Sequence, residues 1–212
     1  MVPTMRGNRS LPFVLIAVSA LVLGACGDDA DEPAGDASQP LAETSDEGAI
    51  EVAMVDAEGA DVGTVTLTPE DGATRVEAEV SGIEPGFHGF HIHDVGRCEA
   101  DAPDGPFTTA TGHLVGEGGA HGTHDGDLPS LYVATDGSAS LAVTLDAFTV
   151  DELTADDGAA IMIHAGADNF ANIPDRYTSS EAGSDPGPDD MTNSTGDAGG
   201  RIACGVVESS GT

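Results

Sequence analysis

The sequence predicts an all-β domain folded as a sandwich or a flattened barrel. Charged and aliphatic residues alternate along Arg75–Val80, and Leu141–Leu145 repeats the alternation, as half-buried strands do. Turn signals such as Asp136–Gly137 follow the apolar runs, which is typical of hairpins. Helical periodicity is nearly absent, and only Val150–Ala155 could form a turn of helix. Short strands joined by turns are typical of a sandwich or a flattened barrel.

In chain order, about eight strands are expected from these patterns. The first two are joined by a glycine-containing turn at Glu58–Gly59, and a His-x-His strand precedes the first of two long interruptions. The expected strands are Ile50–Met54, Val62–Leu67, Arg75–Val80, Gly89–His93, Leu131–Val133, Leu141–Leu145, Ala159–Ile163 and Ile202–Val207.

Two loops rich in Gly, Pro and Asp interrupt the strands at Gly96–Ser130 and Ala165–Gly200. Loops of roughly 35 residues are uncommon in compact domains and are usually functional or disordered. The first loop carries Cys98 and the second ends just before Cys204. This even pair of cysteines predicts a disulfide in an exported protein.

The N-terminal segment predicts export. Arg6 and Arg9 precede an apolar run, Leu11–Gly24, which is too short to span a bilayer. The run ends in Leu-Gly-Ala-Cys and resembles the lipobox of bacterial lipoproteins, in which Cys26 would carry the lipid. An ordinary secretory signal with an incidental cysteine is the alternative.

Three segments follow from this interpretation. Residues 1–25 would be the signal peptide, and residues 26–47 a lipid-anchored, acidic, disordered linker, because Gly27–Glu47 holds acids and no base. Residues 48–212 would form one domain. We expect an exported protein anchored at the extracytoplasmic face of a bacterial membrane, at the cell surface or in the periplasm.

The formal net charge of −32, with no lysine, argues against nucleic acid and anionic membrane surfaces as partners. Membrane contact is therefore expected only through the N-terminal lipid. The oligomeric state stays open.

All seven histidines fall in three short clusters. His91 and His93 project to the same face of their expected strand, and His164 ends another strand that could approach the same spot. Neutral imidazole is the commonest protein ligand for copper and zinc. Two exposed polar residues on a half-buried strand are the plainer alternative for His91 and His93.

A second group lies in the first long loop. His121, His124 and Asp127 are spaced so that a turn or a short 3₁₀ segment would bring them to one side. With His113 they supply three nitrogens and one oxygen, which suits tetrahedral zinc. A hydrophilic loop with histidines by chance is disfavoured by their density.

Five motifs, in this order, resemble those of the bacterial copper/zinc superoxide dismutases of lipoprotein type, over nearly all of the chain from Gly48 onward. They are Gly86–His93, Gly112–His113, His124–Leu128, His164–Asp168 and Gly196–Gly205. The resemblance implies an eight-stranded Greek-key flattened barrel, related to the immunoglobulin-like sandwich, with two long functional loops.

The resemblance also implies a ligand set. Copper would be bound by His91, His93, His113 and His164, and zinc by His113, His121, His124 and Asp127, with His113 as a shared imidazolate. Asp168 would hydrogen-bond one histidine of each site, and Arg201 would lie beside the open face of copper. Cys98 and Cys204 match the family's disulfide, and His88 matches a position that binds no metal.

The implied activity is dismutation of superoxide by a copper redox cycle. One superoxide reduces copper(II) and leaves as dioxygen, and a second oxidises copper(I) and leaves as hydrogen peroxide after taking two protons. His113 would take up a proton when it releases copper and return it later. Arg201 would attract and hydrogen-bond the anion.

Two departures from the family pattern matter. The loop from His113 to Asp127 is shorter than in most members, and some short-loop relatives work with copper alone, so an enzyme without zinc stays open. The segment from Asp168 to Asp197 holds seven acids and only Arg176, although steering of an anion needs positive potential. Arg201 and copper would then attract superoxide locally, within a repulsive field.

Two other functions are compatible with parts of the sequence. One is a non-catalytic surface lipoprotein of the same fold that binds or stores copper. The other is an acidic, lipid-anchored structural protein that binds divalent cations. Arg201, Asp168 and the full histidine set favour the enzyme, because storage requires neither an arginine nor an open copper face.

Overall fold

The computed structural model describes residues 48–116, 119–180 and 185–209. The expected signal peptide, the lipid attachment at Cys26 and the acidic linker lie outside the described residues. None of the helices in the described ranges is long and apolar enough to cross a membrane.

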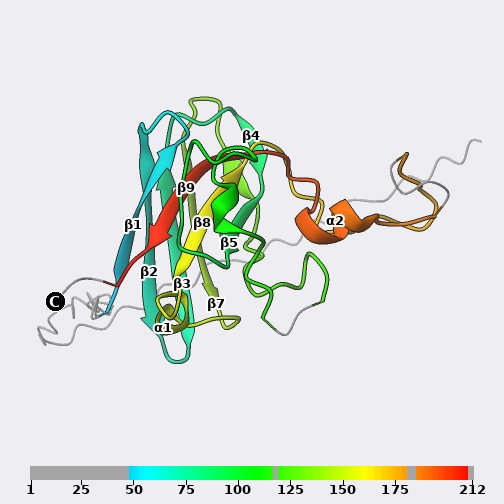
Figure 1. Cartoon of the computed structure of the whole chain (residues 1–212). Helices are drawn as coiled ribbons and strands as arrows, with labels where there is room; N and C mark the ends of the chain where they lie inside the picture. Colours follow the sequence, from blue (N-terminus) through cyan, green and yellow to red (C-terminus); the bar gives the residue numbers. More distant parts are fainter. Residues whose placement is uncertain (1–47, 117–118, 181–184, 210–212) are drawn as a thin grey trace, which may run out of the picture. The chain divides into compact units, whose positions relative to one another are not determined.

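The described part of the chain is all-β, as predicted, with three short helical turns (Figure 1). The strands are β1 (Ile50–Asp56), β2 (Asp61–Glu70), β3 (Ala73–Val80), β4 (Gly86–His88), β5 (Phe90–His93), β6 (Leu131–Val133), β7 (Ala139–Leu145), β8 (Ala159–His164) and β9 (Arg201–Val207). The helical turns are η1 (Thr108–Ala110), α1 (Val150–Leu153) and α2 (Asp190–Thr195).

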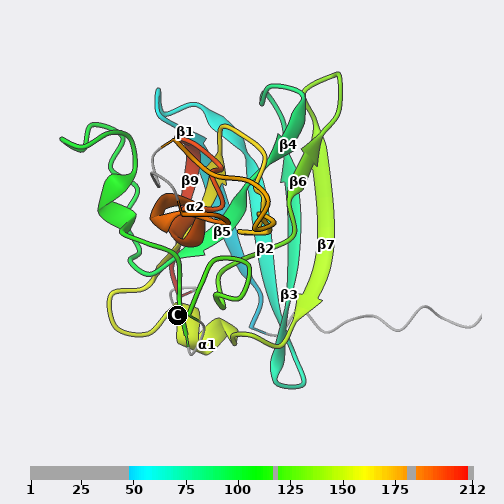
Figure 2. The same cartoon turned by 90° about the vertical axis from the view of Figure 1, so that its right-hand side faces the viewer.

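The strands form a curled antiparallel sheet. Its order is β5-β8-β9-β1-β2-β3-β7, and β4 pairs with β6 in a second sheet of two strands (Figure 2). Strand β7 lies beside β3, and β9 lies beside β1. Connections therefore cross between strands that are distant in sequence, as in a Greek key.

The expected His-x-His strand forms as β5, and a further short strand, β4, precedes it with only Gly89 between them. Strand β4 pairs with β6, while β5 pairs with β8, so this short stretch of chain joins the two sheets. The second long loop approaches Gly89 closely, because a Cβ there would lie 2.6 Å from the Cβ of Ala198. Strand β4 is thus the one strand beyond the eight that were expected from the sequence.

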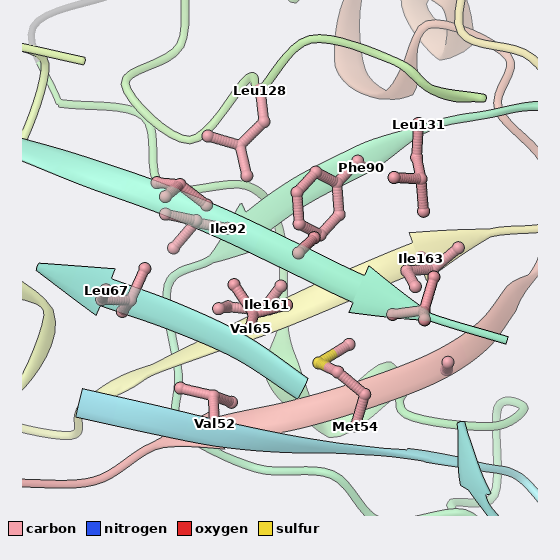
Figure 3. Close-up of a cluster of buried hydrophobic side chains, with 14 of the residues drawn as sticks. Val52, Met54, Val65, Leu67, Phe90, Ile92, Leu128, Leu131, Ile161 and Ile163 are labelled. Carbon is pink, nitrogen blue, oxygen red and sulfur yellow. The ribbon is translucent and has the colours of Figure 1, made fainter. Parts of the chain in front are cut away.

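The main hydrophobic core lies inside the curl (Figure 3). Phe90 and Ile92 of β5 are fully buried there, beside Ile161 and Ile163 of β8. Because side chains alternate along a strand, burial of these residues turns the intervening residues of both strands outward. Core packing thereby fixes the direction of His91 between them.

A smaller cluster covers the outer face of β8 and β9. It contains Phe107 and Ala110 from the first long loop, with Met162 of β8. Cys204 of β9 belongs to the same cluster and forms the predicted disulfide with Cys98. The bridge ties the first long loop to the last strand.

The three helical turns are short, and side chains cap the N-termini of α1 and α2. The turn expected near residue 150 is α1, which has a capping box between Thr149 and Glu152. Helix α2 lies in the second long loop and has Asp189 as its N-cap. Neither η1 nor α2 was expected from the sequence.

Candidate metal centre

Two neighbouring strands place the first group of histidines. His91 and His93 are on β5, and β5 pairs with β8, opposite Met162 and Ala160. His164 is the last residue of β8. All three histidines are buried although they point away from the main core.

The first long loop supplies the other ligands because it runs along the free edge of β5. Leu114 donates its backbone N–H to the carbonyl of Ile92, and Ile92 donates to the carbonyl of Gly126, at 2.8 and 2.9 Å. Isolated bridges then place His113 opposite His93 and Asp127 opposite His91. This loop thus delivers its ligands by pairing with the strand that carries the first histidines.

The first cluster consists of His91, His93, His113 and His164, whose candidate ligand atoms all lie within 4.8 Å of one another. In His93 and His164, Nδ1 donates to a backbone carbonyl at 3.0 Å, of Thr111 and Gly199 respectively. Their Nε2 atoms therefore face each other, 3.4 Å apart. A ring whose outer nitrogen is tied in this way presents its other nitrogen to a metal.

The second cluster adjoins the first. His91, His113, His121 and Asp127 also have ligand atoms within 4.8 Å of one another. His124, which the sequence analysis assigns to this site, is beside them, with Nδ1 3.5 Å from Oδ2 of Asp127. The four residues predicted for zinc are therefore brought together, and His91 lies between the two groups.

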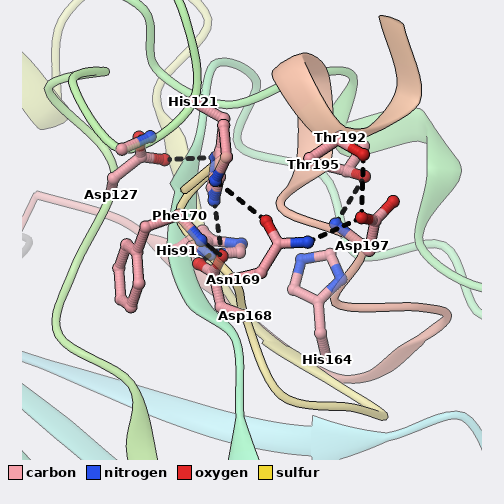
Figure 4. A network of polar contacts seen from close by, with 12 residues as sticks. His91, His121, Asp127, His164, Asp168, Asn169, Phe170, Thr192, Thr195 and Asp197 are labelled. Carbon is pink, nitrogen blue, oxygen red and sulfur yellow. Dashed lines mark hydrogen bonds and ion pairs between the residues drawn. The ribbon is translucent and has the colours of Figure 1, made fainter. Parts of the chain in front are cut away.

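Asp168 connects the clusters (Figure 4). Its Oδ2 accepts from Nε2 of His91 at 2.7 Å, and its Oδ1 accepts from Nε2 of His121 at 2.8 Å. Both interactions are fully buried, with 0% exposure of all three side chains. Because each Nε2 carries the proton in these bonds, Nδ1 of each ring is left free to bind a metal.

Burial favours the neutral form of His91, His93 and His164. It lowers the pKa of His91 and places that of His93 well below its ordinary value. Burial also lowers the pKa of His164 to about 3. Neutral imidazole is the form that binds metal, so these rings need release no proton to do so.

The second cluster is more polar. Burial alone would lower the pKa of His121, but the carboxylates of Asp127 and Asp168 outweigh it and raise that pKa to about 9. Burial likewise opposes ionisation of Asp127, yet the hydrogen bonds from His113 and His121 bring its pKa below the ordinary value. A cation at this position would replace the proton on His121.

Arg201, at the start of β9, lies against the first cluster. Its guanidinium donates to the carbonyls of Phe107, at 2.5 Å, and of Thr111. The Thr111 carbonyl also accepts from His93, so one peptide group contacts both side chains. Burial is the main reason why the pKa of His93 is low, and the positive charge of Arg201 lowers it further.

The residues present fit a pair of metal ions. Among the described residues, Nδ1 of His91 is buried without a hydrogen-bond partner, and Nδ1 of His121 and of His124 face the Asp127 carboxylate at 3.1 and 3.5 Å, as expected of nitrogens that share a cation with it. The ring of His113 lies between the clusters, with its centroid 4.9 Å from that of His93 and 5.0 Å from that of His121. Imidazole with one carboxylate suits copper and zinc.

Comparison with known proteins agrees with the geometry. The sequence profile of the family described as copper/zinc superoxide dismutase (SODC) matches residues 62–207. The chain belongs to the copper/zinc superoxide dismutase family. The copper/zinc superoxide dismutase of Mycolicibacterium paratuberculosis is 41% identical over 224 residues, which cover 94% of this chain and 98% of that protein.

Two further members of the family support the assignment. The Mycobacterium tuberculosis superoxide dismutase is 47% identical over 162 residues, or 72% of this chain and 67% of the relative. The solved structure of the Brucella abortus copper/zinc superoxide dismutase superimposes with a TM-score of 0.54 at 28% identity, over 76% of this chain and 99% of that one. The chain is thus a superoxide dismutase of the copper/zinc type, with copper and zinc as the metals of its family.

Some residues of the site had no signal in the sequence. Phe107 and Thr111 act through backbone carbonyls, which every residue possesses. Phe170 stacks on His121, with ring centroids 6.2 Å apart and the planes 13° from parallel. A large aromatic residue in a loop of Gly, Asp and Asn was the one feature that could have drawn attention to it.

Proposed function

We propose that superoxide is dismutated at the first cluster, with copper held by His91, His93, His113 and His164. Zinc would be held by His113, His121, His124 and Asp127. The observation that carries this proposal is the position of His113, whose ring lies between the two groups and faces both. Copper, when bound, supplies the one-electron redox chemistry.

His113 is suited to carry a proton to a reduced substrate at the first cluster. Its Nδ1 lies 3.0 Å from Oδ1 of Asp127, on the side of the second cluster. Its Nε2 is therefore the atom that faces the first cluster and can take up a proton and give it to a reduced substrate. A cation at the second cluster keeps Nδ1 occupied, so that only Nε2 exchanges its proton.

Arg201 would bind the superoxide anion beside the first cluster. Its side chain is partly exposed, and two carbonyls fix its guanidinium. A fixed cation near the place where negative charge develops stabilises it without reorganisation. His113 and Arg201 are thus the two residues to which we assign catalytic roles.

Replacement of Arg201 tests the proposal. We expect Arg201→Ala to lower kcat/KM for superoxide by at least about tenfold, with copper affinity nearly unchanged because Arg201 is not a ligand. Arg75→Ala removes the same charge from β3 and should have little effect. Unchanged turnover in Arg201→Ala would favour a protein that stores copper.

We also propose that the protein acts outside the cytoplasm, attached by lipid at Cys26. The sequence of residues 1–26 and the disulfide between Cys98 and Cys204 support this, because disulfides persist in oxidising compartments. Mass spectrometry of the mature N-terminus would test it. An unmodified Cys26 in the membrane-associated protein would contradict the anchor.

A further inference from the structure

The second cluster is covered by residues from outside its own loop. The loop around His121 is rich in glycine, and its small residues offer little to shield a metal. Nevertheless the side chain of His121 is 0% exposed and that of Asp127 is 3% exposed. Something other than the loop must exclude water from this side.

Phe170 of the second long loop lies beside His121 (Figure 4). Its ring is nearly parallel to the imidazole, at 13° and with the centroids 6.2 Å apart. Phe170 is 39% exposed and belongs to neither hydrophobic cluster of the described residues. Its ring therefore contributes to the metal site and not to the core.

Two contacts of the Phe170 backbone, one with Asp168 and one with Gly122, hold this residue beside His121. The Phe170 N–H donates to Oδ1 of Asp168 at 2.7 Å, the oxygen that also accepts from His121. The Phe170 carbonyl packs against Gly122, where a Cβ would lie only 2.6 Å from that oxygen. The backbone of Phe170 has φ of 54°, an unusual value for an aromatic residue, which these contacts maintain.

We propose that Phe170 is a positioning residue that closes the second metal site. For His121 to release zinc, its ring must swing away from the ion, and water must reach the freed coordination position. The Phe170 ring opposes both steps, because an apolar shell around a metal site controls solvent access. This inference rests on the proposed binding of zinc by His113, His121, His124 and Asp127.

The test measures release of zinc from the protein loaded with copper and zinc. Zinc transferred to an excess of a chromophoric chelator is followed by absorbance for wild type, Phe170→Ala and Phe170→Leu. We expect the alanine variant to release zinc at least about tenfold faster than wild type, and leucine to lie between them because it keeps an apolar cover. Phe87→Ala, which shortens an exposed phenylalanine on β4, is the matched control and should behave as wild type.

A second measurement distinguishes loss of the apolar cover at the zinc site from a general loss of structure. Cobalt(II) placed in the zinc position should show altered visible absorption in Phe170→Ala, since the orientation of His121 changes. The electron paramagnetic resonance spectrum of copper should stay as in wild type, because Phe170 does not contact the rings of His93 or His164 in the described structure.

Each outcome bears on the proposal. Equal rates of zinc release in Phe170→Ala and Phe87→Ala would overturn the cover while leaving the zinc site intact. If the alanine variant does not fold, Phe170→Leu decides: faster release than wild type supports the cover, and equal release contradicts it. Wild-type protein that takes up copper but no second ion would refute the zinc assignment and the cover together.

Discussion

The Thr111 carbonyl contacts two functional side chains, and the Thr111 backbone adopts an unfavourable conformation. Its φ of 62° and ψ of −146° lie in a region that glycine adopts readily and β-branched residues rarely do. Its carbonyl accepts from His93 and from Arg201. We infer that the conformation persists because these contacts require it, with a strain of about 1–3 kcal/mol.

Glycine at position 111 should relieve this strain. We expect Thr111→Gly to raise the free energy of unfolding by about 1 kcal/mol, since the strain removed exceeds the extra backbone entropy of glycine in the unfolded chain. The carbonyl contacts do not involve the side chain, so dismutation should be retained. Urea denaturation of the metal-free protein, with an activity assay of the loaded protein, measures both.

Thr135→Gly is the control for this substitution. Thr135 is exposed in a turn and is not among the described residues with positive φ. Glycine there relieves nothing and should leave stability unchanged or lower it slightly. If both substitutions lowered stability equally, Thr111 would not be strained in solution.

Some residues of the site could be predicted from the sequence, and others could not. Every predicted ligand is a side chain whose type and spacing point to metal, and the structure brings them all together. The carbonyls that hold Arg201 were not predictable, because their function depends on the path of the chain between Phe107 and Thr111. The position of His91 between the clusters was also unforeseen, since the family resemblance assigned it to copper alone.

At the scale of elements, the disulfide fastens the first long loop to β9. Cys98 and Cys204 are 106 residues apart in sequence. Reduction, or replacement of both by serine, should lower the free energy of unfolding of the metal-free protein by about 4–5 kcal/mol, mainly through the entropy that the unfolded chain regains. Urea denaturation with and without reductant measures the difference.

The double serine variant is also the control for reductant. Its unfolding midpoint should not respond to reductant, whereas that of the wild type should fall. A wild-type midpoint that stays constant on complete reduction would show that other contacts hold the loop to β9. The small cluster of Phe107, Ala110 and Met162 would then be the next candidate.

The strands were largely predictable and the small elements were not. Alternation identified strands such as β3 and β7, because one of their faces is buried. Helix α2 has six residues, too few for a helix that is stable alone. Its place is set by tertiary contacts such as the bond from the His121 N–H to the carbonyl of Asn193, at 2.9 Å. The break between β4 and β5 at Gly89 likewise lies where a distant loop approaches closely.

At the scale of the whole molecule, a formal charge of −32 opposes the approach of an anionic substrate. Added salt screens this repulsion more than the short-range attraction of Arg201 and the metals. The Debye length falls from about 30 to about 8 Å between about 0.01 and 0.15 M salt. We therefore expect the rate constant for superoxide to rise, or at least not to fall, over this range.

Pulse radiolysis at several salt concentrations measures this dependence directly. An inert anion such as perchlorate at constant pH avoids competition for copper and keeps protonation fixed. A steep fall of the rate constant with salt would mean that a local positive field dominates despite the net charge. The distribution of charge around the site, and not its sum, would then control encounter.

The position of Asp168 between the two clusters limits how this site could be transplanted or redesigned. Since its two carboxylate oxygens orient rings that belong to different ions, replacement of this one side chain would disturb both alignments at once. A graft of the redox half onto another β-barrel would have to bring both loops with it. The two clusters would therefore have to be transferred together.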